Sequence, residues 1–204
     1  SLMRMHVARP VGTGPWPGIL FYSDIYQLGG PILRLVNRLA GYGFVVAAPE
    51  IFHRIEPVGS VIEPDAIGRL RGNDAARRTE IAQHDADADA VLQWLSADAG
   101  VDAERLGALG FCIGGHLAFR AALRPLLKAT ACLYPTGLHN GKLGRGEADS
   151  LQRRGEIQGA LFTLFGSEDP HVPADDRAQI VEALSGLQHE TMLVEANHTF
   201  MRDD

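Results

Sequence analysis

The sequence predicts an α/β fold, in which a mostly parallel central sheet carries helices on both faces as a three-layer sandwich. Two patterns support this prediction. Short apolar runs alternate along the chain with segments of helical spacing. The apolar runs are continuous, which is typical of parallel strands buried on both faces. The length of 204 residues suits one full core, so we expect a single domain over residues 1–204.

The first third of the chain predicts two strands and one helix. An apolar run at 18–23 follows a lead-in rich in Gly and Pro and indicates a buried strand. Residues 31–39 place their apolar side chains on one helical face, and glycines end that pattern. A second strand is predicted at 44–48, where Pro49 closes it.

The middle of the chain is less regular. Residues 50–80 mix arginines with Pro and Gly, and we expect long loops and a weak helix there. Residues 81–95 predict a better helix, with Asp85, Asp87 and Asp89 near its start. Alternate helical positions point to different faces, which disfavours a metal site. We expect a solvated first turn that suits the helix dipole.

The second half again alternates strands and helices. Strands are predicted at 129–134, 160–165 and 190–195, a helix at 174–184, and a polar, Gly-rich loop or short cap at 137–155. The sequence ends six residues after His198. We expect a last helix that covers the sheet at this point, and the sequence does not contain it.

The segment Gly110-Phe111-Cys112-Ile113-Gly114-Gly115 carries the clearest chemical signal. An apolar run leads into it and a helical pattern leaves it, so a cysteine stands at the tip of a sharp strand–turn–helix connection. This is the context of the G-x-S-x-G nucleophile elbow, with sulfur in place of oxygen. The glycines allow a strained turn and close packing of its neighbours.

An acid and a base follow later strands. Asp169 comes after the strand at 160–165, and His198 comes after the strand at 190–195. The order Cys112, Asp169, His198 is that of the α/β-hydrolase triad, and the three strand ends meet at one edge of a parallel sheet. His198 would accept the thiol proton, and Asp169 would fix its tautomer. We expect an oxyanion to bind the backbone N–H groups of Ile113 and of the Asp24–Ile25 loop.

These residues resemble the dienelactone hydrolase (carboxymethylenebutenolidase) family of the α/β-hydrolase superfamily. The resemblance rests on residues 110–115, the Gly166-x-x-Asp169-x-x-Val172-Pro173 segment and His198-Thr199-Phe200, with further matches at 23–26 and 48–52. It covers most of the chain from Gly18 onward. It implies an α/β-hydrolase fold and a cysteine hydrolase that opens a small ester or lactone through an acyl-enzyme on Cys112.

The resemblance also implies roles for further residues. Asp24 takes the position of a carboxylate that helps gate the ionisation of the thiol, where well-known members carry glutamate. Arg202 matches one of the arginines that hold the substrate carboxylate. A second arginine should come from 50–80, where Arg69 aligns best without a gap and three others compete: Arg71, Arg77 and Arg78.

Several alternative interpretations apply to single residues. His171 is a rival base, but it would share a loop with Asp169, its own orienter. Cys132 lies in an apolar strand and is expected in the core. His116 is either packed in the helix or placed behind the site. The other histidines show no metal-ligand spacing, so we expect neither a metal nor a cofactor.

The composition limits which binding partners and which cellular compartment we expect. The net charge is −6, and no basic stripe interleaved with aromatic residues predicts nucleic-acid binding. No apolar run is long enough to cross a membrane. Two cysteines make no disulfide framework, so we expect a reducing compartment, the cytoplasm. The sequence does not determine the oligomeric state.

Two alternatives to a dienelactone hydrolase remain at this point. The same triad could act on another small ester, thioester or lactone. In a different class, the protein could be non-catalytic and use the elbow thiol as a redox sensor or ligand-binding site. The ordered acid and base argue against a sensor, which needs neither.

Overall fold

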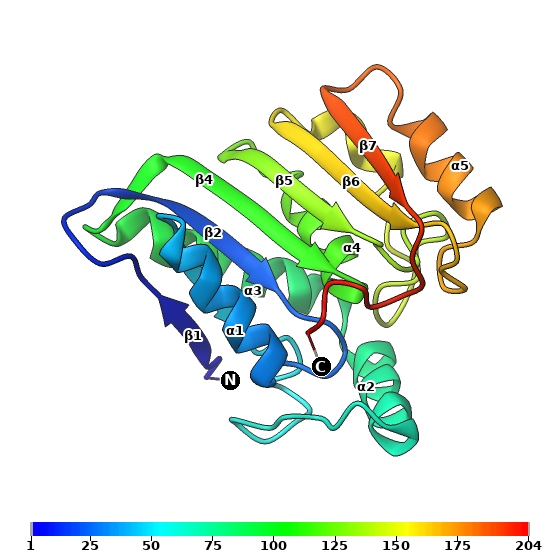
Figure 1. Ribbon diagram of the computed structural model, residues 1–204, viewed down its shortest axis with the longest axis horizontal. Coiled ribbons are helices and arrows are strands. Elements are labelled where there is room, and N and C mark those ends of the chain that lie inside the picture. The colour runs from blue at the N-terminus through cyan, green and yellow to red at the C-terminus, as the bar shows by residue number, and fades with distance from the viewer. Residues whose placement is uncertain (1, 204) are drawn as a thin grey trace.

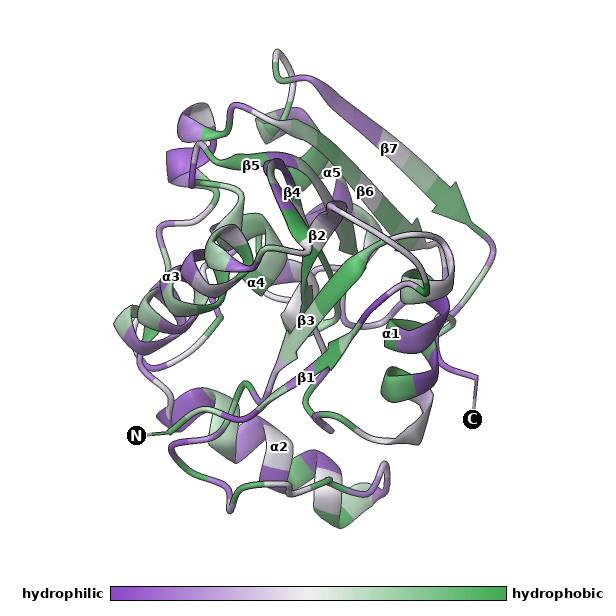
Figure 2. Cartoon of the chain, turned by 90° about the vertical axis from the view of Figure 1, so that its left-hand side faces the viewer, coloured by the Kyte–Doolittle hydropathy of each residue, from purple (hydrophilic) through white to green (hydrophobic). Residues whose placement is uncertain are grey.

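The computed structural model describes residues 2–203 and contains a seven-stranded sheet in the order β1-β3-β2-β4-β5-β6-β7. Figure 1 shows helix α1 (Gly30–Gly41) on one face of the sheet and helices α3 (Ile81–Ala97) and α4 (Ile113–Ala121) on the other. Figure 2 views the sheet from its β1 edge, with α1 on the opposite side from α3 and α4. The predicted α/β architecture with three layers is confirmed.

The strands follow the predicted order, with one addition at the edge. They are β1 (Met5–Ala8), β2 (Trp16–Tyr22), β3 (Val45–Pro49), β4 (Val101–Phe111), β5 (Leu127–Leu133), β6 (Ala160–Gly166) and β7 (His189–Val194). Strands β2 to β7 pair in parallel, whereas β1 pairs antiparallel with β3. The sequence reading missed β1, because four mostly half-buried residues at an edge show no continuous apolar run.

The remaining elements are helix α2 (Ala66–Arg78), helix α5 (Ala174–Ala183) and the 3-10 helix η1 (Gln152–Glu156). Helix α2 is the weak helix expected within 50–80. Its N-cap residue is Asp65, whose side chain accepts a hydrogen bond from Gly68 N at 2.7 Å and so satisfies a free N–H group of the first turn. Within residues 2–203, every helix is too short or too polar to pass through a lipid bilayer.

The core divides into two layers because successive side chains of each strand point to opposite faces. In β2, Leu20 packs with the layer beneath α3 and α4, and Phe21 packs with the layer beneath α1. The ring of Phe21 meets that of Phe111 edge to face, with centroids 5.8 Å apart. This packing fixes β2 against β4, the two strands that lead into the Asp24 loop and the Cys112 turn.

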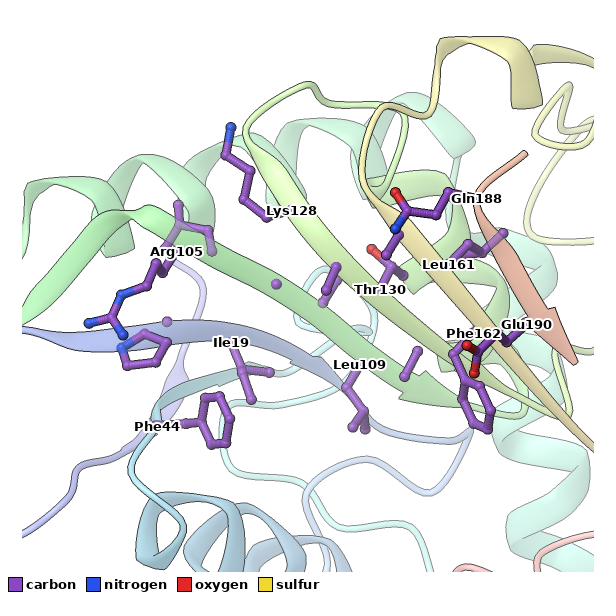
Figure 3. Close-up of a pocket in the computed structure, with 18 of the residues that line it drawn as sticks. Ile19, Phe44, Arg105, Leu109, Lys128, Thr130, Leu161, Phe162, Gln188 and Glu190 are labelled. Carbon is purple, nitrogen blue, oxygen red and sulfur yellow. The ribbon is translucent and has the colours of Figure 1, made fainter. Parts of the chain in front are cut away.

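The face that carries α1 is only partly covered. An apolar hollow of about 570 Å³ runs over β2, β4, β5 and β6, and Figure 3 shows Ile19, Leu109 and Phe162 along it. Among residues 2–203, α1 is the helix packed against this layer, beside β3 and β1. The last covering helix that we expect stays a prediction.

Two of the three aspartates at the start of α3 do not lie in the solvated turn that we expected, whereas the third, Asp89, is exposed. Asp87 is 7% exposed and receives two hydrogen bonds from the Arg54 guanidinium, at 2.5 and 2.7 Å. Asp85 receives a bidentate pair from Arg120 of α4, at 2.7 and 2.8 Å. For Asp85 and Asp87 the prediction was wrong because both arginines come from other segments of the fold, which local helical spacing does not reveal.

Candidate active site

The carboxyl ends of the parallel strands gather the predicted residues at one edge of the sheet. Strands β2, β4 and β6 lead into Asp24, Cys112 and Asp169, and β7 leads into the segment that carries His198. Strand β3 lies on one side of β2 and strand β4 lies on the other, so the order in which strands are added to the sheet reverses at β2. Open α/β sheets place their ligand sites outside such a switch point.

Cys112 stands on a strained turn between β4 and α4, with φ 59° and ψ −128°. The flanking glycines are required by close backbone contacts. A Cβ atom on Gly110 would lie 2.1 Å from the carbonyl oxygen of Gly114, and one on Gly114 would lie 2.4 Å from that of Ser23. The elbow geometry predicted from the sequence is therefore present, and any side chain at either position would push it apart.

Backbone hydrogen bonds hold the turn in place. Cys112 N donates to Leu133 O at 3.1 Å, and Cys112 O accepts from the N–H groups of Gly115 and Thr136, both at 3.1 Å. The turn is thus tied to the end of β5 and to the chain beyond it. Ile113 is the first residue of α4, so its N–H lies at the positive end of the helix dipole.

Asp169 and His198 form a hydrogen-bonded pair. Asp169 Oδ2 lies 2.7 Å from His198 Nδ1, and Asp169 Oδ1 accepts a hydrogen bond from His171 N at 2.8 Å. Burial opposes ionisation of Asp169, but the bonds from His198 and His171 outweigh it and hold its pKa below the usual range. Burial also lowers the pKa of His198, but hydrogen bonds to Asp169 and Cys112 raise it to about 9.

Two aromatic rings confine the imidazole of His198. The ring centroid of Tyr134 lies 4.8 Å away and that of His171 lies 4.6 Å away, both edge to face. The ring of His171 therefore packs against His198, while Nδ1 of His198 is hydrogen-bonded to the Asp169 carboxylate. Sequence reasoning missed Tyr134, although it directly follows β5 at the same sheet edge, and that position was the available signal.

Asp24 and Arg202 form a buried ion pair. Arg202 Nη1 lies 2.6 Å from Asp24 Oδ2, and the two side chains are 8% and 2% exposed. Asp24 Oδ1 accepts a hydrogen bond from Tyr26 N at 2.8 Å, and the Arg202 guanidinium lies over the Tyr26 ring. Arg202 is thus tied to the Asp24 loop rather than solvated.

A cavity of about 600 Å³ opens beside these groups. Among its lining residues are Cys112, His198, Asp24, Ile25, Ile113, His171, Arg69, Asn73, Arg77 and Lys142. Of the four arginines that competed in the sequence, Arg69 and Arg77 line the cavity, whereas Arg71 binds Glu56 and Arg78 binds Asp74. Asn73 and Lys142 were missed, because the cavity wall is assembled from segments without a motif.

The remaining predicted candidates lie elsewhere. Cys132 is fully buried, and burial raises the pKa of its thiol. His116 is fully buried in α4, where its ring nitrogens contact Thr136 O at 3.2 Å and Ser150 Oγ at 2.9 Å. Across residues 2–203, no three His, Cys, Asp or Glu side chains come together as metal ligands.

Comparison with known proteins identifies the family. The model of the dienelactone hydrolase family matches residues 3–204. The chain belongs to the dienelactone hydrolase family. Two relatives of this family member, from Saccharomyces cerevisiae and from Synechocystis, both bear the name "Putative carboxymethylenebutenolidase". The yeast protein is 34% identical over all of this chain and 78% of its own length. The Synechocystis protein is 30% identical over 90% of this chain and 74% of its own length.

A solved structure supports the fold of this dienelactone hydrolase family member. The crystal structure of a "Putative Dienelactone Hydrolase" from Klebsiella pneumoniae matches with a TM-score of 0.76 and 24% identity, over 98% of this chain and 89% of that one. The family model and the two relatives confirm the resemblance inferred from the sequence, and this structure supports the fold. The family and the relatives indicate a hydrolase that acts on ester or lactone bonds.

Proposed function

We propose that this protein opens a small ester or lactone through an acyl-enzyme on Cys112, with dienelactone as the model substrate. One observation carries the proposal: the imidazole that binds the buried Asp169 carboxylate at 2.7 Å lines the same cavity as the elbow thiol, and its interaction with that thiol helps to raise its pKa. A cysteine on a strained turn becomes a nucleophile when such an oriented base takes its proton.

The reaction would begin with transfer of the thiol proton to Nε2 of His198. The sulfur then attacks the carbonyl carbon, and the carbonyl π electrons move to oxygen. The N–H groups of Ile113 and Ile25 would bind that oxyanion. Both residues line the cavity, and the Ile25 N–H has no hydrogen-bond acceptor among residues 2–203, which leaves it available.

The tetrahedral intermediate would collapse by breaking the bond to the leaving oxygen, which takes the proton from His198. A thioester on Cys112 remains. Water then attacks its carbonyl carbon while His198 accepts a proton, and the carbon–sulfur bond breaks to release the acid and restore the thiolate. Asp169 keeps its negative charge throughout and stabilises the imidazolium.

We propose Arg69 as the residue that holds the substrate carboxylate, because it lines the cavity with Cys112. Asp24 would help to gate the ionisation of the thiol from the same wall, and Arg202 would position Asp24 through their ion pair. We place the protein in the cytoplasm, since Cys112 must remain a thiol and both cysteines are free.

The test is hydrolysis of dienelactone and of p-nitrophenyl acetate by wild type and Cys112→Ala. We expect wild type to turn over both, and the variant to lose at least about a hundredfold in kcat/KM. Trapping of an acyl group on Cys112 by mass spectrometry checks the intermediate. Turnover of the aryl ester alone would remove only the substrate assignment. Absence of both activities would contradict the enzyme proposal and favour a binding or redox role.

A further inference from the structure

Three cationic side chains line the cavity: Arg69, Arg77 and Lys142. One carboxylate, that of Asp24, faces them from the lining, and it already pairs with Arg202 at 2.6 Å. The whole chain carries a net charge of −6, so its composition does not account for a positive cavity wall. A cleft lined by one sign of charge concentrates ligands of the opposite sign.

The three cations fall into two positions along the cavity. Arg69, Asn73 and Arg77 follow each other at intervals of four residues, so they lie on one face of α2. Eight residues of helix advance about 12 Å, which separates the Cα atoms of Arg69 and Arg77 by roughly that distance. The positive charge of Arg69 acts to lower the pKa values of His171 and Tyr26, so Arg69 lies near both side chains. It therefore lies at the end of the cavity that contains Cys112.

Close packing holds this face of α2 toward the site. A Cβ atom on Gly72 would lie 2.6 Å from the carbonyl oxygen of Ile25, so the helix backbone touches the Asp24–Ile25 loop. Gly72 is therefore the position at which α2 approaches the reaction centre. The polar residues on either side of it, Arg69 and Asn73, are carried to the cavity as a consequence.

Lys142 reaches the cavity from a second segment that is tied to the end of α2. Lys142 N donates to Gly137 O at 3.0 Å, and the next residue, Leu143, is buried. Three residues after Lys142, Arg145 N donates to the carbonyl oxygen of Thr79, the residue directly after α2, at 2.7 Å, and the Arg145 side chain pairs with Glu80. The segments that carry Lys142 and Arg77 are thus fastened to each other.

These cations are available to a ligand. Within residues 2–203, neither Arg69 nor Lys142 has a carboxylate at ion-pair distance. Arg77 reaches Asp74 at 3.3 Å and shares that carboxylate with Arg78, also at 3.3 Å. An incoming anion can therefore recruit Arg77 and leave Asp74 paired with Arg78.

We propose that Arg77 and Lys142 form a second anion subsite, so that the preferred substrates are esters or lactones with two anionic groups. This inference rests on the proposed function, in which Arg69 holds the first carboxylate near Cys112. The outer pair would bind a carboxylate at the far end of the same molecule. The subsite acts on recognition, not on the chemical step.

Protection of Cys112 from iodoacetamide tests the subsite without requiring turnover. The probes are adipate, pimelate and suberate, compared with the monocarboxylates hexanoate, heptanoate and octanoate. The variants are Lys142→Met and Arg77→Met. Matched controls are Lys128→Met, at the start of β5 in the hollow of Figure 3, and Arg78→Met, which shares Asp74 but does not line the cavity.

At low ionic strength we expect the best dicarboxylate to protect wild type at about a threefold to fivefold lower concentration than its monocarboxylate, the size expected of exposed ion pairs. The difference should vanish in Lys142→Met and Arg77→Met, persist in both controls, and fade at roughly 1 M salt. Equal protection by both ligand classes in wild type, or equal losses in the controls, would overturn the subsite. A supported subsite with no hydrolysis would overturn only the proposed function.

Discussion

The imidazole of His198 sets the pH dependence of the proposed reaction. Hydrogen bonds to Asp169 and Cys112 raise its pKa to about 9 against the opposing effect of burial. Below that pH, His198 holds the proton that the leaving group needs; above it, the proton is lost. We therefore expect kcat/KM for a neutral alkyl ester, whose alkoxide leaves only with a proton, to fall as pH rises through about 9. Asp169→Asn should move this decrease in kcat/KM to lower pH. If the decrease stays at the same pH, a group other than His198 causes it.

The raised pKa of His198 also makes the free energy of unfolding depend on pH. Because the folded pKa of His198 lies above the unfolded value of 6.5, its contribution is complete below pH 6.5. The contribution is then lost as pH rises from 6.5 to about 9. The carboxylate partner behaves oppositely, because the lowered pKa of Asp169 means that its contribution is lost as the pH falls through acidic values.

The ion pair between Asp24 and Arg202 makes a second residue-scale prediction. Both side chains are almost completely buried, so removal of one leaves an uncompensated charge. Arg202→Met should lower the free energy of unfolding by about 3–5 kcal/mol, and Asp24→Asn/Arg202→Met by less than the sum of the single changes. Urea denaturation measures all three variants.

An exposed pair provides the control for this cycle. Arg9 and Asp98 form a bidentate contact, but their side chains are 43% and 18% exposed. Solvent screens such a pair, so Arg9→Met should cost no more than about 1 kcal/mol. A loss at Arg202 no larger than that at Arg9 would show that burial does not strengthen the Asp24 contact.

At the scale of elements, the strand–turn–helix of β4 and α4 depends on glycine. A Cβ atom on Gly114 would lie 2.4 and 2.6 Å from the carbonyl oxygens of Ser23 and Tyr22, which are backbone atoms of β2 and its following loop. We expect Gly114→Ala to lower stability by about 3 kcal/mol or more and to displace Cys112. Thermal unfolding and the alkylation rate of Cys112 measure the two effects separately.

Gly41, at the end of helix α1, is the matched control for Gly114. A Cβ atom on Gly41 would meet no heavy atom within 4 Å, and its backbone φ is not positive. Gly41→Ala should therefore be neutral or stabilising by up to about 1 kcal/mol. Comparable losses at both positions would mean that the close contact at Gly114 is not the cause.

Most elements could be predicted because their patterns are local. Continuous apolar runs indicated β2 to β7 to within a few residues, and glycines marked the elbow. Strand β1 was missed, since a short edge strand acquires its pairing only from β3. The boundaries of α2 were also uncertain, because its apolar face is weak and its packing depends on Gly72 against Ile25.

At the scale of the whole molecule, buried histidines between α3 and α4 make the fold sensitive to acid. Burial lowers the pKa of His84 to about 4, against Asp87 and Asp85, which raise it, and Arg54 and Arg120, which lower it further. Between pH 6.5 and 4 the unfolded chain holds a proton that the folded chain does not, so stability falls as pH falls. His116, with a pKa lowered to about 3, extends this trend.

The variant His84→Leu tests this cause. Nε2 of His84 is buried without a hydrogen-bond partner in the described chain, so its removal breaks no hydrogen bond there. We expect the loss of unfolding free energy between pH 6.5 and 4 to shrink by on the order of 2 kcal/mol. Denaturant titrations at several pH values measure it, and an unchanged slope would assign the acid sensitivity elsewhere.

The sequence by itself determined the fold class, the order of the elements, and the gathering of Cys112, Asp169 and His198 at one sheet edge. Local periodicity defines the strands, and parallel strands bring their carboxyl ends together. Only the tertiary structure decided the Asp24–Arg202 pair, the partners of Asp85 and Asp87, and which arginines face the cavity. These contacts join segments far apart in the chain, and the packing of whole elements, not local spacing, brings them together.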